Sequence, residues 1–119
     1  MKRKISGDTL YVLDGSDNVV LSIKVSKAEK DATLSVSGSL THDASPEFED
    51  ELMSVLTSGY RVAIDFSGLE YISAPALDVL LTVQRLVDEN RFDFYLRNIS
   101  GAVKETFEQT GFIDLLEIR

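Results

Sequence analysis

Five short stretches rich in apolar residues have the length and pattern of β-strands. They cover residues 9–13, 19–25, 33–38, 61–66 and 92–96. The alternation is clearest over 33–38, where leucine and valine share one face and serines share the other. The turn-forming run Asp-Gly-Ser-Asp that follows the first stretch predicts a β-hairpin over residues 9–25.

Apolar residues recur at helical spacing in three further stretches. The first helix is predicted to begin at Ser45-Pro46, with Ser45 as the N-cap, and to end at Gly59. The second begins at 73–75 with a similar serine–proline signature and runs to about Asn90. These signatures predict helix starts because serine accepts hydrogen bonds from free N–H groups and proline lacks an N–H to satisfy.

A third helix is predicted to begin at Ser100, which can cap it, and to end before Gly111. Residues 27–31 are expected to form a charged connector, and Ser67-Gly68 a turn. Residues 115–118 fit either a last short strand or a helical turn, and the pattern does not separate these.

The predicted order alternates strands with helices after the third strand, which favours an α/β fold with some parallel pairing. We expect one domain over residues 1–119, with a mixed central sheet, packed helices and an extra N-terminal hairpin. Its predicted core consists of Leu34, Val36, Leu52, Leu56, Val62, Ile64, Leu77, Leu80, Leu81, Phe94, Leu96, Val103 and Phe107.

The chain is acidic, with a formal net charge of −8 and no cysteine. This charge disfavours binding to nucleic acid or to anionic membranes. No apolar stretch is long enough for a signal peptide or a membrane span, so we expect a cytoplasmic protein. The absence of cysteine excludes disulfides and thiolate-based metal sites.

Signals for catalysis are weak. His42 is the only histidine, and it lies beside Asp43 in a predicted loop. Sequence neighbours rarely supply the two sides of a catalytic triad, so a solvated loop residue is the favoured interpretation. The sequence contains no nucleophile elbow, HExxH motif or phosphate-binding glycine loop. We therefore expect no enzyme activity, no metal and no cofactor.

The most informative segment is DFSGLEYISAPALDVLL, residues 65–81. It resembles the pattern D-L-S-x-L/V-x-Y/F-I/M-D/S-S-x-G-L-x-x-L of the STAS family. The stretch NISGAVKETFEQTGF is similar to the late segment of that family, and SGSLTHDASPEFEDEL is similar to the strand and first-helix segment. Together these matches cover residues 33–116 in the family's order and spacing.

The resemblance to bacterial anti-sigma factor antagonists implies a regulatory domain that docks on a kinase-type anti-sigma factor and releases a sigma factor. It implies a binding surface at the start of the second helix and at the loop before the first. The residues that we expect in this surface are Ser67, Tyr71, Ser73, Ala74, Pro75 and Asp78, together with Thr41, His42 and Asp43.

One departure from the family pattern lies at the position of the phosphorylated serine, which is Ala74 here. Alanine has no hydroxyl, so we expect a domain that is not switched by phosphorylation at this position. Ser73, one residue earlier, is the alternative acceptor. The favoured role of Ser73 is that of a plain N-cap, which stabilises a helix by about 1 kcal/mol.

Two other functions stay open. STAS domains also occur in self-assembling scaffolds, and the sequence does not decide between a monomer and a homodimer. STAS domains of anion transporters are proposed to bind nucleotide or lipid. The absence of a phosphate loop and of a membrane segment counts against this small-ligand function.

Overall fold

The computed structural model describes residues 1–90, 92–99 and 101–119. The strands are β1 (Lys2–Ser6), β2 (Thr9–Leu13), β3 (Val19–Ala28), β4 (Asp31–Leu40), β5 (Arg61–Ile72) and β6 (Phe94–Arg97). The helices are α1 (Ser45–Thr57), α2 (Ala74–Asn90) and α3 (Gly101–Thr110), followed by the short 3-10 helix η1 (Phe112–Asp114).

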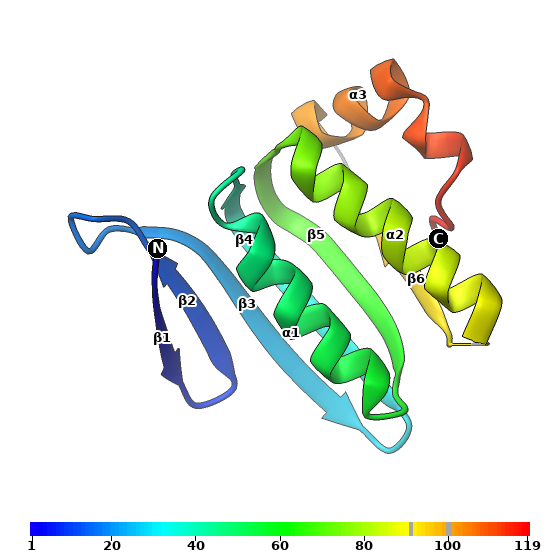
Figure 1. Cartoon of the computed structure of the whole chain (residues 1–119), viewed down its shortest axis with the longest axis horizontal. Helices are drawn as coiled ribbons and strands as arrows, with labels where there is room; N and C mark the ends of the chain where they lie inside the picture. The colour runs from blue at the N-terminus through cyan, green and yellow to red at the C-terminus, as the bar shows by residue number, and fades with distance from the viewer. Residues whose placement is uncertain (91, 100) are drawn as a thin grey trace.

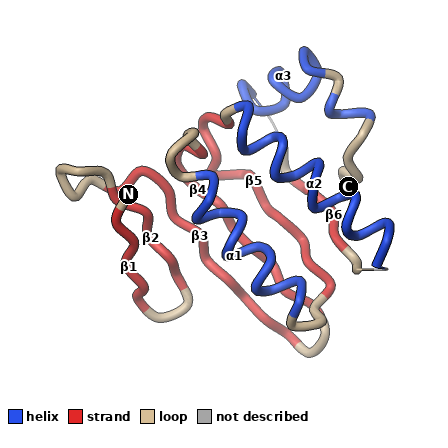
Figure 2. The backbone as a smooth tube through the Cα atoms, in the orientation of Figure 1, coloured by secondary structure: helices blue, strands red, loops and turns tan. Residues whose placement is uncertain are grey.

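All six strands form one mixed sheet in which the spatial order follows the chain order (Figure 1). Strands β1 to β4 pair antiparallel, whereas β4, β5 and β6 pair in parallel. Helices α1 and α2 connect the parallel strands and lie side by side on the sheet (Figure 2). The α/β class, the mixed sheet, the hairpin over 9–25 and the three helices were all correctly predicted.

The core lies between the sheet and its helices. Twelve of the thirteen predicted core residues are buried, as in the register row Leu34, Ile64 and Leu96. Leu81 is the exception, because it is only half-buried. Helix α2 instead turns Val83 toward the sheet, three residues after Leu80, so Leu81 falls at the side of the buried stripe.

Strand β1 was not predicted. All five of its side chains are exposed, so its sequence KRKIS has no alternation of apolar and polar residues for a pattern to detect. Backbone pairing with β2 forms this strand, from Lys2 opposite Leu13 to Ser6 opposite Thr9.

The charged connector predicted over 27–31 is wrong. Strand β3 continues to Ala28, β4 begins at Asp31, and only Glu29 and Lys30 form the turn between them. The strand ends extend beyond the apolar core, so their side chains face solvent while the backbone still pairs, as Ala28 does with Asp31.

The turn predicted at Ser67-Gly68 is also wrong, because β5 runs through it to Ile72. The β4–β5 register shifts here, between Ser35 and Ser37, which indicates a bulge. Gly68 fits this position because a Cβ atom there would lie 2.4 Å from the Ser37 Oγ.

The C-terminal part of the chain differs in detail from the prediction. Strand β6 covers Phe94–Arg97 rather than 92–96. The open alternatives for 115–118 resolve into a single parallel bridge between Ile118 and Leu96 that follows η1. The predicted cap at Ser100 lies outside the described residues, whereas Gly111 has the expected left-handed conformation, with φ of 77°.

Candidate functional site

The carboxyl ends of β4 and β5 place the two predicted loops together. Leu40 pairs with Ile72 at the last position of both strands. The Ser73 N–H donates a 2.9 Å hydrogen bond to the Leu40 carbonyl oxygen. Because parallel strands end at the same edge of the sheet, the start of α2 and the loop before α1 form one continuous region.

Helix α2 follows β5 without a connecting loop. Ser73 is 4% exposed, and its Oγ accepts a hydrogen bond of 3.4 Å from the Ala76 N–H. The Ser73 carbonyl oxygen also accepts the N–H of Leu77 at 3.1 Å. This is the geometry of an N-cap, and it agrees with the role favoured for Ser73 from the sequence.

The start of α1 differs from the prediction, because Ser45 is not the N-cap. Ser45 is the first helical residue, and its Oγ donates a 2.8 Å hydrogen bond to the His42 carbonyl oxygen. The residue before the helix, Ala44, has no side-chain acceptor. The Thr41 Oγ accepts the Ala44 N–H at 3.2 Å, which stabilises the turn before the helix, and no side chain caps α1 itself.

The predicted surface residues differ in exposure. Tyr71 is 53% exposed, which is unusual for a large aromatic side chain. The other exposed members are Ser67, Ala74, Asp78, His42 and Asp43, whereas Thr41 and Pro75 are half-buried and Ser73 is buried. The accessible part of the predicted surface therefore consists of two side chains from β5, two from α2 and two from the loop before α1.

A shallow groove of about 370 Å³ separates the first turns of α1 and α2. Pro46 and Pro75 line it from the two helix starts, and Val79 contributes an apolar side chain. Glu49, Asp50 and Asp78 give this groove a negative charge. It adjoins the predicted surface through Pro75 and Asp78, which belong to both.

Asp65 supports the site and was not selected from the sequence. Its Oδ1 accepts the Ser67 N–H at 2.9 Å, and its Oδ2 accepts the Asn98 amide at 3.1 Å. Partial burial acts to raise the pKa of Asp65, but these hydrogen bonds and the charge of Arg97 outweigh it and lower the pKa below 3.8. The available signal was an aspartate two residues before a suspected turn.

The described residues offer little for catalysis. His42 is exposed in its loop, and no group of three or more metal-ligating side chains occurs within residues 1–90, 92–99 and 101–119. Within the same ranges, no helix has the length and apolar character required to cross a membrane.

Comparison with known proteins agrees with this architecture. The family model described as "Mlab, STAS domain" matches residues 23–117. The anti-sigma-B factor antagonist of Staphylococcus aureus is 23% identical over 99 residues, which cover 82% of this chain and 92% of that protein.

Two solved structures show the same fold. An anti-sigma factor antagonist from Mycobacterium paratuberculosis has a TM-score of 0.69 at 19% identity, covering 82% of this chain and 84% of that chain. Unphosphorylated SpoIIAA, an anti-sigma factor antagonist from Bacillus, has a TM-score of 0.68 at 14% identity, covering 82% and 87%.

The fold and the family match together define a small domain of the α/β class. The chain belongs to the STAS domain family. Within that family it is distantly similar to the anti-sigma factor antagonists.

Proposed function

We propose that this domain is an anti-sigma factor antagonist that docks on a kinase-type anti-sigma factor and thereby releases a sigma factor. The observation that supports the proposal is the continuous exposed surface at the carboxyl ends of β4 and β5. The exposed side chains of this surface, such as Tyr71 at 53% exposure, lie close in the chain to residues that are buried in the core. A rigid support lowers the entropic cost of binding.

The start of α2 is the centre of the proposed contact. Ala74 and Asp78 are exposed one helical turn apart, while Ala76 and Leu77 between them are buried in the core. Asp78 also lines the acidic groove between α1 and α2. We therefore infer that the partner presents a positively charged side chain to Asp78.

The experiment is calorimetric titration of the full chain with the purified kinase-type anti-sigma factor of the same organism. Asp78→Arg is expected to weaken binding at least about 100-fold, because like charges then meet within the contact. Glu89→Arg is the matched control, since it makes the same charge change at an exposed position in the last turn of the same helix. Equal affinities for both variants, or no binding by the unaltered chain, would refute the proposed docking.

We further propose that phosphorylation does not switch this docking. The usual acceptor position is Ala74, and the neighbouring hydroxyl of Ser73 is 4% exposed and engaged at the helix start. A kinase cannot reach such a hydroxyl without opening the N-terminal turn of α2.

Incubation with the same anti-sigma factor and ATP, followed by intact-mass measurement, tests this second point. The unaltered chain is expected to gain no phosphate, whereas Ala74→Ser is expected to gain one at its exposed position. A phosphate mapped to Ser73 in the unaltered chain would contradict the expectation.

A further inference from the structure

Strand β1 adds an exposed edge that the core does not require. All five of its side chains are exposed, and Ile5 is 67% exposed. The family match begins only at residue 23, so β1 lies outside the part that this chain shares with the family model. An element that buries so little apolar surface contributes little to stability through the core.

The two edges of the sheet are not equivalent. At β6, Leu96 exchanges backbone hydrogen bonds with the C-terminal segment, at 2.9 Å to the Glu117 carbonyl oxygen and 2.8 Å from the Arg119 N–H. Across β1, no further strand is paired within the described residues. Unpaired edges of this kind accept an extended segment from another chain.

The hairpin fixes which backbone groups of β1 point outward. Ser6 and Thr9 flank a two-residue turn, so they form a hydrogen-bonded pair. Hydrogen-bonded and non-hydrogen-bonded pairs alternate along an antiparallel ladder. Arg3 and Ile5 are therefore the residues whose N–H and C=O groups face away from β2.

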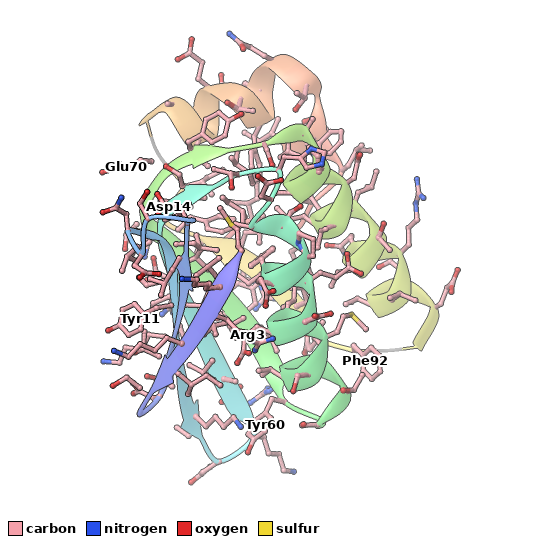
Figure 3. All side chains as sticks on the ribbon, turned by 60° about the vertical axis from the view of Figure 1, so that its left-hand side comes forward. Arg3, Tyr11, Asp14, Tyr60, Glu70 and Phe92 are labelled. Carbon is pink, nitrogen blue, oxygen red and sulfur yellow. The ribbon has the colours of Figure 1, made fainter. Side chains whose placement is uncertain are left out.

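The positive charge of β1 favours an acidic partner segment at this edge. Lys2, Arg3 and Lys4 are consecutive basic residues in a chain of net charge −8. Arg3 lies between β1 and α1 (Figure 3), with its Nη1 3.0 Å from the Glu47 Oε2. A second copy of β1 would place like charges opposite one another, whereas an acidic strand would form favourable cross-strand pairs.

We propose that β1 accepts an extended acidic segment of a protein partner as a seventh strand of the sheet. The start of β1 also adjoins the loop before α1, because Met1, Lys2 and Asp43 line one hollow. A segment bound to β1 would therefore lie next to the exposed Asp43 in the loop before α1. Its binding can be tested with a peptide alone, in the absence of the anti-sigma factor.

The probe is a fluorescein-labelled peptide of alternating glutamate and valine, with a lysine–valine peptide as its counterpart. Fluorescence anisotropy with the full chain is expected to show that the acidic peptide binds at least about tenfold tighter. Ile5→Pro removes an outward N–H without removing a bond to β2, so it is expected to weaken binding at least about tenfold. Ile5→Thr keeps that N–H and is expected to bind as the unaltered chain does.

Amide exchange measured by NMR provides the second readout. The acidic peptide is expected to slow exchange at Arg3 and Ile5, and circular dichroism verifies that Ile5→Pro is folded. The proposal is overturned if both peptides bind equally, if neither binds, or if Ile5→Pro binds as well as Ile5→Thr. It is also overturned if protection at Arg3 and Ile5 rises with protein concentration alone, because that result would show that β1 pairs with a second copy of this chain.

Discussion

The two long helices begin in similar sequences, Ala-Ser-Pro and Ser-Ala-Pro, but their first turns are built differently. In both, proline is the second helical residue. Helix α2 follows β5 directly, and the buried Ser73 caps it. Helix α1 is preceded by a hydrogen-bonded turn over residues 41–44, in which the Thr41 Oγ accepts the Ala44 N–H, and no side chain caps the helix itself. Proline thus predicts the helix start well, but not the capping residue.

The extra turn before α1 has a consequence for the surface. It carries His42 and Asp43 into solvent, while Ala44 beneath them is 0% exposed. At the start of α2 the residue immediately before the proline, Ala74, is exposed, whereas its counterpart in α1, Ser45, is 5% exposed. The residue before each proline is therefore buried at the start of α1 and exposed at the start of α2.

The largest expected effect on stability comes from enlarging the buried Ala44, and the exposed Ala74 provides the comparison. Ala44→Leu is expected to lower the free energy of unfolding by about 2 kcal/mol, because it forces extra atoms into a filled core. Ala74→Leu is expected to change it by less than about 0.5 kcal/mol, as exposed sites usually do. Urea unfolding of both variants measures the contrast, and equal losses would show that the two helix starts are packed alike.

A smaller effect is expected from Asp65, which braces the bulge of β5 before α2. Because its pKa is lowered in the folded state, its contribution to stability is present above pH 3.8 and is lost as the pH falls further. Asp65→Asn is expected to cost about 1 kcal/mol at pH 7 and almost nothing near pH 2. Urea unfolding across this pH range measures the difference, and a loss independent of pH would argue against a charged brace.

The sequence was most informative where side chains alternate between core and solvent. The paired pattern of Leu34 and Val36 and the helical spacing of Leu77 and Leu80 led directly to the correct class and order of elements. It failed at β1, where every side chain is exposed and only backbone pairing makes a strand. Hydrophobic pattern cannot detect an element that buries nothing.

The candidate site was predictable in position but not in detail. The motif over 65–81 located the start of α2, and the structure brings it next to the loop of Thr41. The burial of Ser73 depends on how two loops from separate strands meet, where the Ser73 N–H donates to the Leu40 carbonyl oxygen. Asp65 was missed because its partner Asn98 lies 33 residues away, a distance at which local patterns carry no information.

The sheet adds its strands in the order in which the chain encodes them, from β1 to β6. Most strand pairs are thus close in sequence, and chains with local contacts fold faster than those with distant ones. We expect the antiparallel meander of β1 to β4 to pair before the parallel half of the sheet. The parallel half then follows one crossover at a time, and the bridge at Ile118 closes the far edge last.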